Sequence, residues 1–173
     1  IVGVNLIFGA ARLSGRPERL LESLVDGLSS HRIEIDMIEF SGIEFRRVDN
    51  RVMSLRLVEL GLSAVVIFSD KGKMLQPSEV LYKRPVLVQR GRFRPPTSVH
   101  MNMLECAMNA FTNLDNVEES RVVGIHEITM SNLKIDGRLD LGDFLDRVDI
   151  LSESGLTVLI SDYSRYFRLV EFL

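Results

Sequence analysis

Basic and hydrogen-bonding side chains are concentrated in one short stretch near the middle of the chain, between Arg90 and His100. Arginine stays charged and binds phosphate oxygens bidentately. The amides at a helix N-terminus favour an anion, and a glycine just before them lets the anion approach the backbone. The stretch therefore predicts a phosphate-binding site. Its basic side chains are Arg90, Arg92 and Arg94.

The residues around this stretch predict a strand, a turn and a helix. An apolar run at 86–89 predicts the buried strand. Thr97 or Ser98 is the expected N-cap of an amphipathic helix that reaches Phe111. We expect the three arginines to surround a bound phosphate and His100 to donate a hydrogen bond to its oxygens. The alternative is a solvated basic loop that Pro95 and Pro96 make rigid.

The spacing Gly91-x-Phe93-x-Pro95-x-Thr97-x-x-His100 resembles the G-x-F-x-P-x-[HT]-x-G-H signature of the nucleotidyltransferase superfamily, which includes nicotinate-nucleotide and phosphopantetheine adenylyltransferases. The chain departs from that signature where the family has a glycine before the second histidine, since Val99 stands there. Most of the chain is also similar to uncharacterised bacterial proteins labelled nicotinate-nucleotide adenylyltransferase.

The resemblance implies roles for individual residues. Thr97 and His100 would be the catalytic pair that holds the triphosphate and stabilises the leaving pyrophosphate, with Mg²⁺ as cofactor. Nucleotide binding would fall to the turn: Gly91, Arg92, Phe93 and Arg94. The implied reaction transfers an adenylyl group to a phosphorylated small molecule and needs no covalent enzyme nucleophile. Whether the chain is an enzyme stays open at this point.

Composition narrows the class of protein. With 173 residues, 46% hydrophobic and 26% charged, the chain fits one soluble α/β domain spanning 1–173. Twenty-one basic against twenty-four acidic side chains give a net charge of −3, which argues against nucleic-acid binding. No apolar run reaches the roughly eighteen residues that cross a bilayer, and no leader pattern precedes the first apolar run, so we expect a cytoplasmic protein without membrane contacts. The single cysteine, Cys106, and three separated histidines give no metal-ligand spacing.

A second hypothesis is a non-catalytic assembly or regulatory module of a larger protein. The chain begins inside an apolar run and ends inside a helical pattern, so we expect it to be a piece of a longer chain, with a homo-oligomer or the missing domains as partners. The closing segment supports this hypothesis because it is more aromatic than one core-facing stripe requires. Its apolar side chains are Tyr163, Tyr166, Phe167, Val170 and Phe172.

Hydrophobic periodicity predicts alternating strands and helices. The expected strands lie at 2–8, 33–40, 64–68, 86–89, 121–130 and 157–161. The expected helices begin at Pro17, at Asp49 or Asn50, at Thr97 or Ser98, at Asp143 and at Tyr163, while 73–83 forms either a hairpin or a short excursion. This order predicts a three-layer, Rossmann-like α/β fold, a mostly parallel sheet with helices on both faces.

Ligands of such sheets bind at the carboxyl ends of the strands. Five strand ends are therefore expected at one edge: Gly9-Ala10, Ser69-Asp70, Arg90-Gly91, Thr129-Met130 and Ser161-Asp162. Two of them, Asp70 and Ser161, also resemble the first two motifs of haloacid-dehalogenase-type phosphotransferases. A degenerate fold of that type is a third hypothesis, because Ser69 and Lys71 stand where its two aspartates belong.

Several other polar residues could have either a structural or a functional role. His126, beside Glu127, and His31 are expected to be ordinary core or surface histidines. Thr129, Ser131 and Asn132 either cap a turn or hold a ribose or base. Four aspartates recur near one helix start and favour helix capping and a solvated face around Arg147 over a cation site. They are Asp140, Asp143, Asp146 and Asp149.

Overall fold

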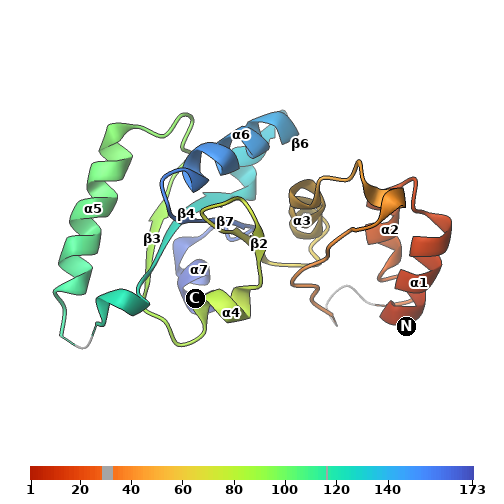
Figure 1. Cartoon of the computed structure of the whole chain (residues 1–173), viewed down its shortest axis with the longest axis horizontal. Helices are drawn as coiled ribbons and strands as arrows, with labels where there is room; N and C mark the ends of the chain where they lie inside the picture. The colour runs from red at the N-terminus through yellow and green to blue at the C-terminus, as the bar shows by residue number, and fades with distance from the viewer. Residues whose placement is uncertain (29–32, 116) are drawn as a thin grey trace.

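The computed structural model describes residues 1–28, 33–115 and 117–173. In chain order its elements are α1 (Val2–Arg12), α2 (Pro17–Ser23), η1 (Ile43–Phe45), α3 (Asn50–Glu59), β1 (Val65–Phe68), β2 (Met74–Leu75), α4 (Pro77–Leu81), β3 (Val86–Arg90), α5 (Ser98–Thr112), η2 (Glu119–Arg121), β4 (Val123–Thr129), η3 (Met130–Leu133), β5 (Lys134–Ile135), β6 (Arg138–Leu139), α6 (Leu141–Ser152), β7 (Thr157–Ser161) and α7 (Tyr166–Phe172). These residues form an α/β fold with seven α-helices and a five-stranded sheet (Figure 1).

The sheet is mixed, which corrects the expectation of a mostly parallel one. Its strand order is β2-β1-β7-β4-β3. The strands β3, β4 and β7 are parallel, with Val88 beside Ile125 and Glu127 beside Leu159. The strand β1 runs antiparallel to both β7 and β2. Periodicity reports which residues are buried and carries no information on strand direction. The sequence pattern therefore did not distinguish a mixed sheet from a mostly parallel one.

Both faces of the sheet are covered. On one face, α3, α6 and the ring of Phe93 pack over Phe68, Ile128 and Ile160. On the other face, α4 and α7 pack over Ile67, Ile125 and Leu159. The helices are therefore on both sides, as the strand–helix alternation predicted.

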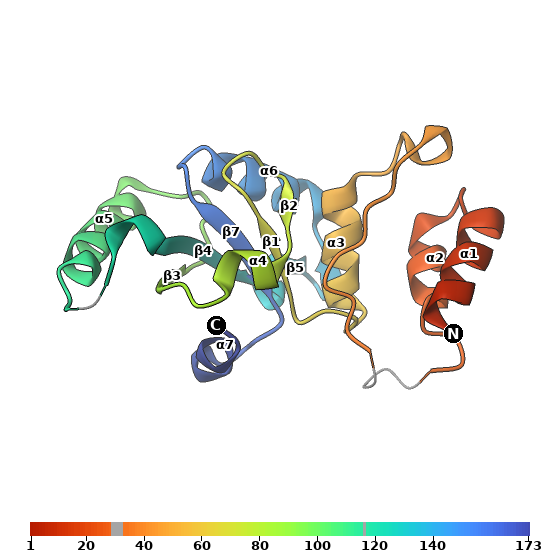
Figure 2. The same ribbon diagram turned by 60° about the horizontal axis from the view of Figure 1, so that its bottom comes forward.

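The helix pair α1–α2 lies apart from the sheet, and α3 lies between this pair and the sheet (Figure 2). Leu20, Leu21 and Leu24 of α2 form a separate core with Met53 and Leu57 of α3. Because α3 also buries Leu55 and Val58 against the sheet, it belongs to both cores.

The predicted strand at 2–8 is wrong, since these residues lie in α1. Short apolar runs fit either a buried strand or a helix, and local periodicity does not separate them. Packing against α2 decides the matter: a Cβ on Gly9 would lie 3.0 Å from Leu20 Cγ, so the glycine lets the two helices approach closely.

The predicted strand at 33–40 is also wrong. Burial of one set of side chains is real, because Ile35, Ile38 and Phe40 pack toward the core of α2 and α3, but it does not alternate: Ile35 and Ile38 are three residues apart and Met37 is exposed. However, no strand among the described residues pairs with it. The Phe40 amide and carbonyl bond instead to the side chain of Asn50, at 2.8 and 3.0 Å. The apolar residues of this segment therefore report burial against a core, without a strand ladder.

The remaining elements agree closely with the expected ones. Asp49 is the N-cap of α3 and accepts a hydrogen bond from the Arg51 amide at 2.9 Å. The uncertain region at 73–83 is the short strand β2 followed by α4. The closing helix begins at Tyr166 rather than Tyr163. None of the helices in the described ranges is both long and apolar enough to span a bilayer.

Only three of the five expected strand ends share one edge. Arg90-Gly91, Thr129-Met130 and Ser161-Asp162 follow the parallel strands and lie together. Ser69-Asp70 lies at the opposite edge because β1 is antiparallel, and Gly9-Ala10 lies within α1.

Candidate functional site

The turn between Gly91 and His100 is built around one buried aromatic ring. Phe93 is 1% exposed. Its ring centroid lies 5.1 Å from that of His100 in the first turn of α5 and 5.0 Å from that of His126 on β4. Its backbone has a φ of 46°, the left-handed region that a bulky residue rarely adopts. Burial of the ring holds the turn in this conformation and joins α5 to the sheet.

Gly91 is required by this ring. A Cβ at position 91 would lie 2.9 Å from Phe93 Cζ, which is closer than a real Cβ contact. The Gly91 amide donates to the Glu127 carbonyl at 3.0 Å and continues the ladder of β3 with β4. Both the missing side chain and the amide of Gly91 thus have partners inside the chain.

Thr97 and His100 form a capping box at the beginning of α5. Thr97, one of the two predicted candidates, is the N-cap. His100 Nδ1 accepts a hydrogen bond from the Thr97 amide at 3.0 Å and lies 2.8 Å from Thr97 Oγ1. Because the Thr97 side chain in turn accepts from the His100 amide, two of the helix-start amides are satisfied within the chain. The imidazole keeps Nε2 for any external partner.

Arg90 points away from the turn, to the other face of the sheet. Its guanidinium donates to both carboxylate oxygens of Glu127, at 2.5 and 3.1 Å, and to the Tyr163 carbonyl at 2.9 Å. Glu127 is fully buried and also accepts from Ser161 Oγ at 2.5 Å. The network links the carboxyl ends of β3, β4 and β7.

Arg94 bonds to the carboxylate of Asp143 in α6, at 3.2 Å. Asp143 also pairs with Arg147, which donates to the Arg92 carbonyl at 2.9 Å and to the Asn132 carbonyl at 3.1 Å. Arg147 is 3% exposed, so its predicted place on a solvated face is wrong. The three arginines of the motif therefore diverge: Arg92 and Arg94 are both exposed at the turn, and Arg94 is held by Asp143.

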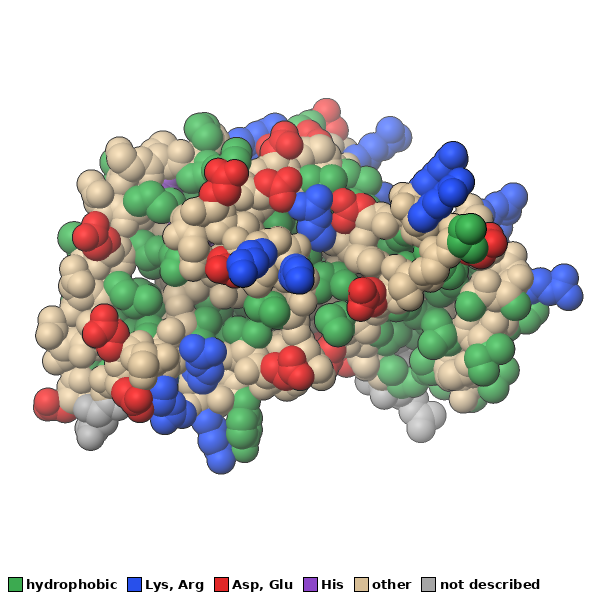
Figure 3. Space-filling model, in the orientation of Figure 1, with side chains coloured by type: hydrophobic (Ala, Val, Ile, Leu, Met, Phe, Trp, Pro, Cys, Tyr) green, Lys and Arg blue, Asp and Glu red, His purple; other side chains and the backbone are tan. Residues whose placement is uncertain are grey.

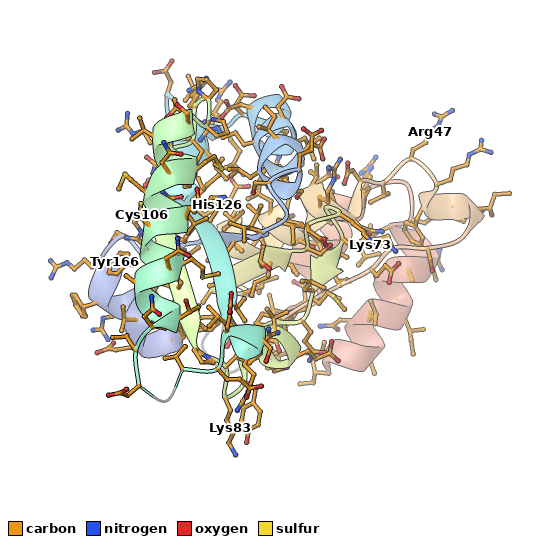
Figure 4. The ribbon with its side chains drawn as sticks, turned by 60° about the vertical axis from the view of Figure 1, so that its left-hand side comes forward. Arg47, Lys73, Lys83, Cys106, His126 and Tyr166 are labelled. Carbon is orange, nitrogen blue, oxygen red and sulfur yellow. The ribbon has the colours of Figure 1, made fainter. Side chains whose placement is uncertain are left out.

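His126 is a core histidine beneath the Phe93 ring. Ser154 Oγ donates to the Leu151 carbonyl at 2.5 Å, so its 3.2 Å contact with His126 Nε2 has the imidazole as donor. Neither His126 Nδ1 nor the neighbouring Gln89 Oε1 has a partner in the described part of the chain. Burial, reinforced by the charge of His100, lowers the pKa of His126 to about 4. Figure 4 shows His126 on β4 behind α5.

The other candidate residues from the sequence do not form a common site. Asp70 lies near Thr157 at the start of β7, whereas Ser161 ends that strand, so the two haloacid-dehalogenase-type positions are at opposite edges of the sheet. Thr129 Oγ1 contacts Ser131 Oγ at 3.0 Å at the start of η3. His31 lies outside the described residues.

The aspartates near α6 serve caps and ion pairs. Asp140 is the N-cap of α6 and accepts from the Asp143 amide at 3.1 Å, so the helix begins two residues before the predicted Asp143 and the expected capping role is confirmed for Asp140. Asp149 binds Arg51 at 2.5 Å. Across the described ranges, no three His, Cys, Asp or Glu side chains are grouped so that they could hold a metal ion.

Two or more large apolar side chains are exposed on each of the helices α1, α5 and α7. On α1, Val4 and Ile7 are 70% and 73% exposed. In Figure 3, hydrophobic side chains gather over the part of the surface that α1 and α2 form, on the right. The closing helix α7 exposes Tyr166, Phe167 and Val170, and α5 exposes Val99 and Met103. Aromatic enrichment had marked only α7 in the sequence; the face of α1 was missed because 2–8 was predicted to be a strand, and that of α5 because its core-facing side is apolar too.

Comparison of the chain with protein-family models, with curated proteins and with solved structures finds no match.

Replacing Gly91 by alanine tests its packing role. We expect Gly91→Ala to lower the free energy of unfolding by roughly 1–3 kcal/mol, because the Phe93 ring must move. Urea denaturation followed by far-UV circular dichroism measures this change. Gly15→Ala is the matched control, since a Cβ there meets nothing within 4 Å. Equal effects of the two substitutions would contradict the packing role.

Acid should destabilise the fold through His126. Its pKa is about 4 in the folded chain against an ordinary value of 6.5. The unfolded chain therefore binds the proton first, and the stability from neutral His126 is full above pH 6.5 and falls as the pH drops towards 4. We expect the difference in unfolding free energy between the parent and His126→Leu to change by about 3 kcal/mol over this window. If the difference in unfolding free energy between the two proteins did not change with pH, the lowered pKa of His126 would be contradicted.

Proposed function

We propose that this chain is a non-catalytic assembly module, an α/β domain that binds other protein surfaces through apolar helical faces. The observation that carries the proposal is the exposure of large apolar side chains on α1, α5 and α7. Burial of such surface is the dominant favourable term in protein association. Large apolar patches are rare on the surfaces of soluble monomers, and where they occur they mark interaction sites.

The geometry of the central turn supports the same proposal. Of the groups expected to bind phosphate, Arg90 and Arg94 are engaged by Glu127 and Asp143. His100 Nδ1 caps α5, and Gly91 lies against the Phe93 ring. Each of these residues has a structural role that explains its presence without a ligand.

The assembly proposal predicts a chain that self-associates and is indifferent to nucleotides. Multi-angle light scattering should give a mass above the 19.6 kDa of one chain that rises with concentration. A thermal-shift screen with Mg²⁺ and nucleotides should leave the Tm unchanged. A ligand at about a hundred times its Kd adds roughly 2.7 kcal/mol of stability, which would raise the Tm by several degrees. A monomer that nucleotides stabilise would contradict the proposal.

The second candidate function is nucleotide or phosphate binding at the turn, in its strongest form adenylyl transfer with Mg²⁺. The observation that favours it is the exposed Arg92 side chain beside the carboxyl end of β3, next to the first turn of α5. His100 Nε2 would donate to a phosphate oxygen while Nδ1 keeps the cap. In this function His100 stabilises the leaving pyrophosphate.

A substitution that preserves the cap separates this role from stability. Glutamine at the third helical position also completes a capping box with an N-cap threonine. We expect His100→Gln to fold like the parent and, if adenylyl transfer occurs, to lower turnover about a hundredfold by removing one donor. The measurement is Mg²⁺-dependent adenylyl transfer from ATP to nicotinate mononucleotide. Equal turnover in both proteins would contradict a catalytic role for His100.

A further inference from the structure

Helix α5 has an apolar stripe on the side that faces away from the sheet. The stripe is formed by exposed side chains spaced four, three and four residues apart, so that it stays on one side of the helix over three turns. Leu114 continues it just past the helix end and is also exposed. We name these residues the α5 stripe: Val99, Met103, Cys106, Ala110 and Leu114.

The stripe is separate from the side of α5 that packs on the protein. Leu104 is the buried residue of the helix, and Ala107, Met108 and Phe111 are half-buried beside it. Leu104 lies about 130° around the helix axis from the middle of the stripe, from the 100° turn per residue. The core of this chain therefore does not account for the apolar stripe, and α5 is the outermost element on its side of the molecule (Figure 1).

We propose that the α5 stripe binds the same stripe of a second copy of this chain, as an antiparallel helix pair with Cys106 on the two-fold axis. The inference rests on the proposed assembly function and names its partner. A two-fold interface requires a surface that is complementary to itself, and the stripe meets that requirement.

The residues of the α5 stripe lie at nearly equal distances along the chain before and after Cys106. An antiparallel pair places Met103 opposite Ala110 of the partner subunit, a large side chain against a small one, and Val99 opposite Leu114 of the partner subunit. Exposed Asn102 and Asn109 flank the stripe on one side, and the same pairing brings each opposite the other. Amides are donors and acceptors at once, so identical amides can bond across the axis.

Charge also favours an antiparallel pair. Glu105 is the only Asp, Glu, Lys or Arg between Ser98 and Thr112, and it lies well away from the stripe. Like charges therefore do not face each other across the axis. Antiparallel packing places the positive N-terminal end of each α5 macrodipole beside the negative C-terminal end of the other. A parallel pair would bring ends of the same sign together.

Cross-linking and sedimentation test the pair. Cys106 is the only cysteine and is exposed, so a short bismaleimide can join two copies only through this position. We expect a covalent dimer on denaturing gels from the parent and from Glu105→Lys, an exposed control on the same helix. Met103→Lys should lose the cross-link and weaken the dimer at least tenfold by sedimentation equilibrium, while its circular dichroism spectrum matches the parent.

The outcomes distinguish this inference from the proposed function. A dimer that Met103→Lys leaves unchanged, and that is not joined through Cys106, would overturn the α5 pairing and leave the assembly proposal standing, because α1 or α7 would then carry the contact. Equal weakening by Met103→Lys and Glu105→Lys would also overturn it. A chain that stays monomeric at every concentration overturns both.

Discussion

The buried carboxylate of Glu127 is the constraint on which the carboxyl edge of the sheet depends. A charge in the interior is tolerated only when its partners are complete, because removing one of them leaves the other uncompensated. Here Arg90 supplies a bidentate pair, Ser161 adds a hydroxyl, and the same guanidinium holds the Tyr163 carbonyl before α7. One ion pair thereby fixes three strands and the closing helix. It also removes the first arginine of the motif from any external anion.

A single ring organises the other face of that edge. Phe93 requires glycine at position 91, packs on the imidazole of His126 and supports the first turn of α5, where His100 and Thr97 complete the cap. The spacing that resembles a nucleotide-binding signature is thus also the spacing of a packed turn and a capping box. The same residue types serve both purposes, because a tight turn followed by a helix N-terminus needs a glycine and a hydrogen-bonding cap in either case.

The proposed assembly function follows from how the helices are placed. Edge strands invite pairing with other chains unless they are covered; at β3, α5 lies alongside and the Tyr166 hydroxyl donates to the Val88 carbonyl at 3.3 Å. In the proposed assembly function, contacts between chains would therefore form on helix faces rather than at the β3 edge, and side chains rather than backbone groups would select the partner. The stripe of α5 is the best defined of these faces, because its residue order is compatible with a copy of itself.

The sequence by itself determined the local elements: β1, β3, β4 and β7 as apolar runs, α2, α3, α5 and α6 by helical spacing, and the caps of α3 and α5 to within two neighbouring residues, Asp49 or Asn50 and Thr97 or Ser98. These depend on interactions within a few residues, which spacing records. Only the tertiary structure decided that 2–8 is helical, that 33–40 has no ladder, that β1 is antiparallel and that Arg90, Arg94 and Arg147 bond to distant carboxylates and carbonyls. Each of these depends on partners far along the chain, and the choice among partners is made by packing.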